Sequence, residues 1–253
     1  DLDQWEVLTG GLKYRYGAAH APVNAELGVS TLEKTYVTNR AGTGFLDYDT
    51  TTFDYVLFYN YSPKTSALLD FTRGAIRFDS VGSRGADGLD YRIRAGLRWI
   101  ATAKTSGDIR VGMMRRTFSD INAEDVTGFS WQATVNWNPL SRSLVELRTA
   151  RSIEQTYRAD SRGIDVRLYG VALTHTLTSR LKSRLDVSRT DSLFIGNPTE
   201  RNDRSYAASL RGDLQLSRIL SLFARATYEH RYSTDDRTKF GRAGGQVGFR
   251  IAY

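Results

Sequence analysis

The sequence has no cysteine and no long apolar run. Without cysteine, disulfide bonds, thiolate metal ligands and a cysteine nucleophile are excluded. No stretch reaches the roughly 18 apolar residues that a transmembrane helix needs, so a helical membrane protein is excluded. The start, DLDQWEV, lacks the basic and then apolar region of a signal peptide, which is typical of a mature or truncated product. A β-barrel stays open, because its strands alternate lipid-facing and lumen-facing residues.

Proline is also scarce, with 4 residues, whereas the 22 glycines and 11% aromatic residues suit a strand-rich protein. Basic residues outnumber acidic ones by 35 to 28, which gives a formal charge of +7. This excess could serve nucleic acid, an anionic membrane surface or an anionic solute. Nucleic acid is disfavoured, because a binding platform carries basic and aromatic residues on one surface, and here they alternate between two.

Apolar and polar residues alternate with a period of two along the whole chain. We distinguish about thirteen segments of roughly ten residues each, the length of a tilted transmembrane strand. The clearest is 129–138, FSWQATVNWN, and 89–99 and 206–216 are nearly as regular. Each has one apolar face and one polar face, and most polar faces carry charge.

The links between these segments alternate in length as well. Short links are expected within 61–66, 102–107, 138–143, 177–180 and 216–219, and longer ones within 37–51, 80–88, 119–127, 156–163, 195–204 and 233–242. Short turns at one end and longer loops at the other are typical of bacterial outer-membrane barrels. The pattern predicts an up-and-down meander that forms one domain over residues 1–253.

A soluble β-sandwich would also alternate, because one face of each sheet packs on a core. Three features favour a membrane barrel over a soluble sandwich. Aromatic residues gather at segment ends, as interfacial girdles do, for example Tyr59, Tyr61, Trp99 and Trp137. Arginine occurs in the middle of many polar faces, and Greek-key crossovers are not indicated. We therefore predict an all-β fold, an up-and-down antiparallel transmembrane β-barrel of a bacterial outer membrane.

The C-terminal segment VGFRIAY carries alternate apolar residues at Val247, Phe249, Ile251 and Tyr253. It resembles the C-terminal signal of bacterial outer-membrane proteins, which implies recognition by the barrel assembly machinery. If Tyr253 ends on the periplasmic side with the short turns, segment 5–16 begins on the extracellular side. Because such barrels normally begin in the periplasm with an even strand number, we expect at least one further strand before residue 1.

The polar faces should line a lumen that is rich in arginine. Its predicted basic residues are Lys13, Arg15, Arg92, Arg94, Arg98, Arg110, Arg116, Arg148, Arg184, Arg211, Arg225 and Arg250, and its acids are Asp54, Asp90, Glu146, Asp186, Asp213 and Glu229. One interpretation is a structural lattice of arginine–carboxylate pairs. The other is that the surplus cations make a pore prefer anions. Both can hold together.

Catalysis is the weaker alternative. His230, close in sequence to Asp235 and Asp236, could belong to a surface hydrolase, but we favour the interpretation as an interfacial histidine beside an acidic loop. His20 and His175 have no clustered ligands, so we predict no metal site and no cofactor. No GxSxG, Walker or HExxH motif is present. We therefore predict that the protein is not an enzyme.

The hairpins of roughly 35 residues, the turns SPKTS and NPLSRS, the strand FDYVLFYNY (53–61) and the ending VGFRIAY together resemble the β-barrel porins associated with exopolysaccharide export. The resemblance is to the C-terminal part of such a barrel. It implies a channel or conduit for small anionic solutes or exported polysaccharide, without a residue-level site. A surface hydrolase and a non-conducting structural or adhesive barrel remain the alternatives.

The resemblance also implies partners. The apolar faces would contact outer-membrane lipid, and periplasmic polysaccharide-export proteins would join a conduit. Apart from the resemblance, the basic charge of the chain suits contact with anionic lipopolysaccharide through loop residues such as Arg40, Arg84, Arg162 and Arg237.

Overall fold

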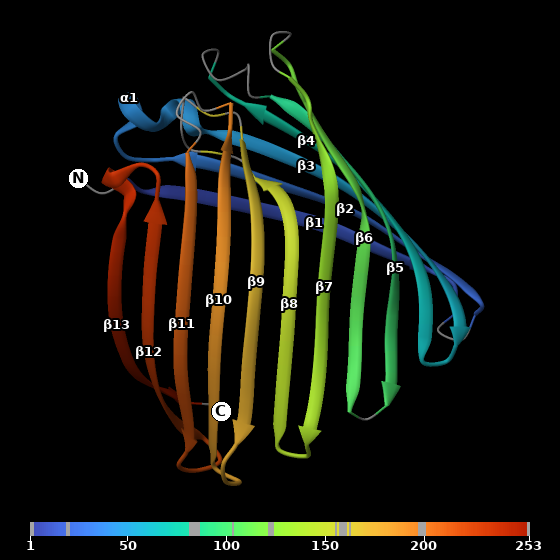
Figure 1. Ribbon diagram of the computed structural model, residues 1–253, viewed down its shortest axis with the longest axis vertical. Coiled ribbons are helices and arrows are strands. Elements are labelled where there is room, and N and C mark those ends of the chain that lie inside the picture. The colour runs from blue at the N-terminus through green and yellow to red at the C-terminus, as the bar shows by residue number, and fades with distance from the viewer. Residues whose placement is uncertain are drawn as a thin grey trace. The chain divides into compact units, whose positions relative to one another are not determined.

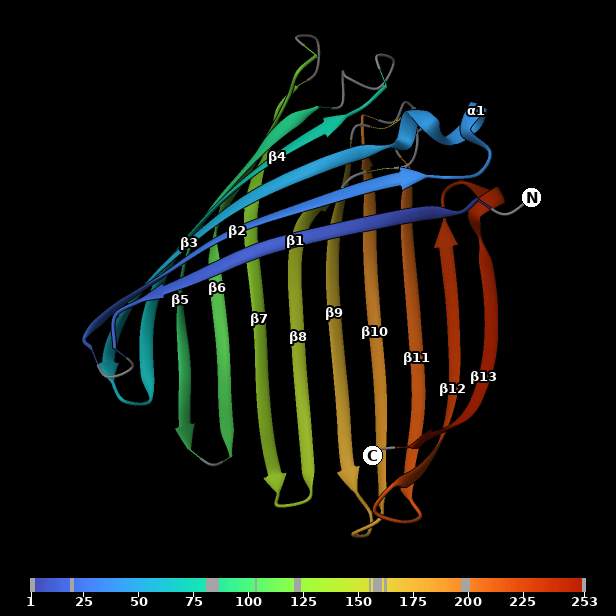
Figure 2. The ribbon, with the colours of Figure 1, turned by 180° about the vertical axis from the view of Figure 1, so that it is seen from behind.

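Thirteen antiparallel strands form one sheet in which every strand lies beside its neighbours in sequence (Figures 1 and 2). The computed structural model describes residues 3–18, 21–80, 87–102, 104–120, 124–154, 156, 161, 163–196 and 201–251. The strands are β1 (Trp5–Tyr16), β2 (Val23–Tyr36), β3 (Tyr48–Ser62), β4 (Thr65–Phe78), β5 (Gly88–Thr102), β6 (Thr105–Phe118), β7 (Val126–Leu140), β8 (Ser143–Glu154), β9 (Gly163–Thr176), β10 (Leu181–Ile195), β11 (Asn202–Gln215), β12 (Leu220–Ser233) and β13 (Phe240–Ile251). The all-β, up-and-down prediction with about thirteen strands is confirmed.

The strands are long enough to cross a bilayer. Each has 12 to 15 residues, which at about 3.3 Å per residue gives roughly 40–50 Å, against a hydrocarbon core of about 30 Å. Helical structure is limited to α1 (Arg40–Thr43), η1 (Gly44–Leu46) and η3 (Asp236–Thr238) among the described residues. No described helix is long and apolar enough to cross a membrane.

Short and long links alternate, as the sequence predicts. The short links are 17–22, 63–64, 103–104, 141–142, 177–180 and 216–219, and the long ones are 37–47, 79–87, 119–125, 155–162, 196–201 and 234–239. Because every strand pair is antiparallel, all short links lie at one end of the strands, the turn end, and all long links at the other, the loop end. Figure 1 shows this for the links on either side of β12.

The chain divides into two compact units. The first comprises Asp1–Trp99, Arg110–Trp131 and Gln155–Gly163, and the second comprises Ile100–Ile109, Gln132–Glu154 and Ile164–Tyr253. The single-domain organisation and the strand expected before residue 1 stay predictions.

The burial of side chains is the reverse of that in a soluble sheet. On β4, Leu69 and Phe71 are 46% and 41% exposed, while Asp70 and Thr72 between and beside them are buried. The second unit likewise exposes Leu210, Val247 and Phe249 on alternate positions. An exposed apolar face and a covered polar face are what a lipid-facing sheet requires, because lipid replaces the core on the apolar side. This arrangement argues against the soluble sandwich.

Candidate functional site

All ten arginines predicted for the lumen lie on the polar face. Several of them have exposed apolar neighbours on the other face, such as Ile93 beside Arg94 and Leu185 beside Arg184. Strand by strand, they are Arg92, Arg94 and Arg98 on β5, Arg110 and Arg116 on β6, Arg148 on β8, Arg184 on β10, Arg211 on β11, Arg225 on β12 and Arg250 on β13. The structure gathers them into separate groups, and each unit has its own.

In the first unit, Asp70 of β4 holds two of these arginines. Its Oδ2 accepts a hydrogen bond from Nη2 of Arg94 at 2.8 Å, and Arg110 of β6 also bonds to it. The Asp70 and Arg94 side chains are about 95% buried. Buried charges are tolerated when they are paired in this way. This group therefore acts as a structural clamp across β4, β5 and β6.

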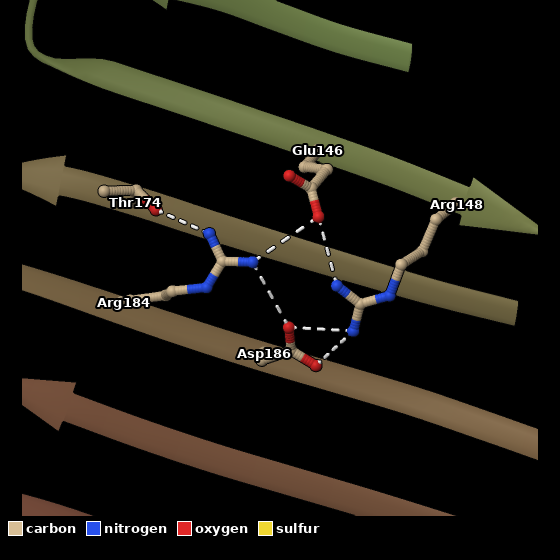
Figure 3. Close-up of polar contacts among 5 residues, drawn as sticks. All are labelled: Glu146, Arg148, Thr174, Arg184 and Asp186. Carbon is tan, nitrogen blue, oxygen red and sulfur yellow. Dashed lines mark hydrogen bonds and ion pairs between the residues drawn. The ribbon is translucent and has the colours of Figure 1, made fainter. Parts of the chain in front are cut away.

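In the second unit, four charged side chains of β8 and β10 form a network (Figure 3). Arg148 donates to Glu146 at 3.1 Å and to both oxygens of Asp186 at 2.6 and 2.8 Å. Arg184 donates to Glu146 at 3.4 Å and to Thr174 of β9 at 3.2 Å. Two acids thus bind two arginines, so the network is close to neutral and fixes the position of Arg184.

Beyond this network, three arginines stand directly opposite one another on adjacent strands. Arg184 of β10 pairs in register with Arg211 of β11, and Arg211 pairs with Arg225 of β12. We call Arg184, Arg211 and Arg225 the arginine row. Like charges at directly opposite positions repel each other, so a sheet gains no stability from this arrangement by itself.

The members of the row differ in their partners. Arg211 binds Asp213 through Nε and Nη2, at 2.6 to 3.0 Å, and its guanidinium lies 4.5 Å from the ring centre of Phe223. Arg225 is exposed and has no hydrogen bond or ion pair among the described residues. The charges of Arg184 and Arg211 are therefore paired with carboxylates, whereas that of Arg225 is not paired among the described residues.

A recess of about 640 Å³ opens on the polar face beside the row, near the turn end. Its charged lining comprises Arg180, Lys182, Arg184, Arg211, Arg250 and Asp213. Hydroxyl groups of Thr174, Thr176 and Thr178 complete one wall. Five cationic groups around one carboxylate raise the local concentration of anions, and guanidinium groups match carboxylate and phosphate oxygens geometrically.

The comparisons with known proteins fit this architecture. Residues 27–253 match a family model described as "Putative beta-barrel porin 2". The chain belongs to this porin family. No curated protein matches the chain. Family membership supports a general role as an outer-membrane channel and locates the protein in the bacterial outer membrane; the association with exopolysaccharide stays a prediction.

Two solved structures share the fold. The FrpB iron transporter from Neisseria meningitidis (F3-3 variant) superimposes with a TM-score of 0.61 at 9% identity, over 92% of this chain and 45% of that one. The copper transporter OprC gives a TM-score of 0.58 at 9% identity, over 97% and 49% of the two chains. The porin chain thus spans less than half of either protein. Both are transporters by name, and at this identity the likeness concerns the fold alone.

The proposed assembly signal is exposed on the apolar face of the porin. Val247, Phe249 and Ile251 of β13 are 81%, 67% and 60% exposed, and Arg250 lies on the opposite face. Tyr253 lies outside the described residues. A row of exposed apolar side chains on the last strand is available to a partner, and its recognition by assembly machinery stays a prediction.

The hydrolase alternative gains no support from His230. Its ring lies 4.4 Å from that of Tyr232 on the apolar face, and His230 has no hydrogen bond or ion pair among the described residues. Nearby, the Lys239 ammonium binds Asp236 and holds the pKa of that carboxyl below its ordinary value. A carboxylate with a lowered pKa is a weak general base.

Several site residues escape the sequence analysis. Asp70 was missed because its strand carries apolar residues on both faces, and Leu68 and Ile76 lie on the same face as Asp70. Lys182 and Arg180 were missed because they adjoin a turn. Strict parity would have found Lys182, which alternates in step with Arg184 and Asp186. Arg180 precedes the strand, where parity gives no signal.

Proposed function

We propose that this porin conducts anionic solutes and selects them at the arginine row. The observation that supports this proposal is the register that sets Arg184, Arg211 and Arg225 opposite one another. A sheet that needed only internal pairing would give each arginine its own acid, as the side chains of β8 and β10 do across β9 in Figure 3. A row of like charges becomes favourable when an anion binds beside it and offsets the repulsion between the guanidinium groups.

The partners of the row suit conduction better than tight binding. Asp213 and Asp186 already occupy part of the donors of Arg211 and Arg184. An anion therefore meets a positive but partly neutralised wall, in which several weak sites follow one another. Lys182 and Arg250 extend the positive wall through the recess towards the turn end. Binding strong enough to attract and weak enough to release is the condition for flow.

The same wall restricts which polysaccharide could pass. A neutral polymer gains nothing from guanidinium groups, whereas carboxylate or phosphate substituents would bind them. We therefore propose that, if an exported polysaccharide is the cargo, it is an acidic one. Such a conduit would require periplasmic export proteins at the turn end.

Uptake into proteoliposomes tests the proposal. The full-length protein is reconstituted, and entry of an anionic solute, gluconate, is compared with that of a neutral solute of similar size, sorbitol. We expect gluconate to enter several-fold faster, and the ratio to fall towards one in Arg225→Gln. Arg73→Gln removes the same charge from the apolar face of β4 and should leave the ratio unchanged.

Two results would overturn the proposal. One is equal entry of both solutes through the unaltered protein. The other is a barrel that admits neither, which would favour the non-conducting alternative. Uronic-acid and neutral disaccharides extend the comparison to sugars, with the same expected order.

A further inference from the structure

Charged residues also occur on the apolar face, and on the described strand residues of the second unit they lie only towards the loop end. Towards the turn end, the positions of this face on β8 to β11 hold residues such as Leu147, Val171, Leu185 and Leu210. Towards the loop end the same face carries Arg151, Asp165, Arg167, Arg189, Asp191 and Arg204. This one-sided distribution has no role in conduction through the polar face.

These residues form two groups with the same composition, two arginines and one aspartate. Asp165 accepts from Arg151 at 2.8 and 2.9 Å and from Arg167 at 3.3 Å. Asp191 accepts from Arg189 at 2.7 and 3.0 Å and from Arg204 at 3.1 Å. Each aspartate orients two guanidinium groups and neutralises one of their charges, so each group retains one positive charge.

The group around Asp191 has spare hydrogen-bonding capacity. Arg189 uses Nε and Nη2 and Arg204 uses Nε, out of five N–H donors on each guanidinium. Neither arginine has another hydrogen-bond partner in the described part of the chain. Their side chains are 40% and 51% exposed. The remaining donors can therefore bind an external anion with several acceptor oxygens.

A groove of about 740 Å³ begins at Arg204 on the same face. Its walls include Tyr206, Tyr228, His230 and Tyr232, and the Tyr206 and Tyr232 rings meet edge to face at 6.1 Å. Tyrosine is amphipathic and is favoured at the boundary between hydrocarbon and head groups. Arginines beside a tyrosine-lined groove therefore fit a ligand with both a phosphate and a larger, partly apolar body.

The position in the membrane identifies the class of ligand. A charge on the lipid face of a barrel costs about 2–4 kcal/mol at the midplane but only about 0–1 kcal/mol near the interface. The charged groups must then lie at head-group level, on the side of the long links, which is the extracellular side in bacterial outer-membrane barrels. There the porin meets the outer leaflet, whose glycolipid carries phosphates.

We propose that Arg189, Arg204 and the tyrosine groove bind a phosphate and the adjoining sugar of lipopolysaccharide, with Asp191 holding the two guanidinium groups in place. The first unit has a similar pair at its own loop end, where Arg115 binds Asp125 at 2.6 Å. The proposal goes beyond conduction, because it concerns the opposite face of the sheet. It also differs from the loop contacts expected from sequence: Arg40 is paired with Asp47 at 2.9 Å, and Arg84 and Arg162 lie outside the described residues.

Binding to the full-length protein in detergent tests the assignment, with native mass spectrometry as the readout. The probes are bisphosphorylated lipid A, its dephosphorylated form and phosphatidylglycerol. We expect lipid A to bind at least tenfold more tightly than either control lipid. The double variant Arg189→Gln/Arg204→Gln should lose about tenfold of that affinity. Arg142→Gln/Arg218→Gln, an equal charge loss in the short links 141–142 and 216–219, should bind like the unaltered protein.

The variant Asp191→Asn distinguishes an effect of the charge at the site from a general loss of folded protein. The substitution keeps the Oδ1 oxygen that accepts from Nε of both arginines, and it removes the negative charge that competes with phosphate, so lipid A should bind more tightly. The assignment is overturned if Asp191→Asn weakens binding as the arginine replacements do. It is equally overturned if phosphatidylglycerol matches lipid A, or if the double variant binds lipid A normally.

Discussion

The guanidinium of Arg148 passes over Gly170 to reach Asp186. Arg148 is on β8, Gly170 is its directly opposite partner on β9, and Asp186 is on β10. A Cβ atom at position 170 would lie 2.7 Å from Nε of Arg148 and 3.0 Å from its Cγ. Because Gly170 has no side chain, it leaves room for the Arg148 side chain to cross β9 and link β8 to β10.

Replacing this glycine should break the interaction between Arg148 and Asp186. In Gly170→Ala, the new methyl group displaces the Arg148 side chain, and the paired hydrogen bonds to Asp186 are lost. We expect a loss of about 1.5–3 kcal/mol in unfolding free energy, the range for hydrogen bonds to charged groups. Urea unfolding of the protein in lipid vesicles measures it. Gly212→Ala, at a β11 position with open space around the added Cβ, should unfold like the unaltered protein.

Two adjacent residues of β11 test which face meets lipid. Leu210 is 54% exposed on the apolar face, and Ser209 points to the polar face opposite Asp186. Leu210→Arg should cost about 2–4 kcal/mol in a bilayer, because the charge enters hydrocarbon. Ser209→Arg should cost little. Equal losses of unfolding free energy for the two variants would contradict the assignment of the faces.

The last strand should matter for assembly. Phe249→Ser removes one of the exposed apolar side chains that resemble an outer-membrane signal. We expect less folded protein in outer-membrane fractions, measured as the heat-modifiable band on an electrophoresis gel. Gln246→Ser changes the opposite face of the same strand and serves as control. Normal assembly of the Phe249 variant would argue against a signal role.

Removing the acid of the recess should act in the opposite direction from removing an arginine. Asp213 binds Arg211 and is the only carboxylate among the described lining residues of the recess. Asp213→Asn leaves the cations uncompensated, so the preference for anions should rise, as measured by the gluconate-to-sorbitol ratio. A falling ratio would show that Asp213 is needed to position Arg211 rather than to moderate its charge.

Alternation of residue types sufficed to predict the strands and their faces. Ile93 and Arg94 fall on opposite sides wherever the strand is placed, because the side-chain period is two. For the same reason, the polar-face position of Arg184, Arg211 and Arg225 followed from sequence. Strict parity would also have placed Arg189 with Leu185 and Val187 on the apolar face.

The contacts across strands could not be predicted in this way. That Arg211 stands opposite both Arg184 and Arg225 depends on the lengths of the hairpin links. A shift of two residues would keep every face but place Asp186 or Lys182 of β10, or Phe223 or Thr227 of β12, opposite Arg211. The passage of Arg148 over Gly170 depends on two registers at once. Only the structure shows which arginines share a carboxylate, and that within the arginine row Arg225 has no hydrogen bond or ion pair among the described residues.

The most direct test of the central claim is the reversal potential of single channels of the full-length protein in a potassium chloride gradient. We predict the sign of an anion-preferring pore, a shift towards zero in Arg225→Gln and a larger shift when Arg184 and Arg211 are also replaced by glutamine. Arg73→Gln should give the value of the unaltered protein. Cation preference in the unaltered pore, or a reversal potential that is the same in all the variants, would contradict selection by the arginine row.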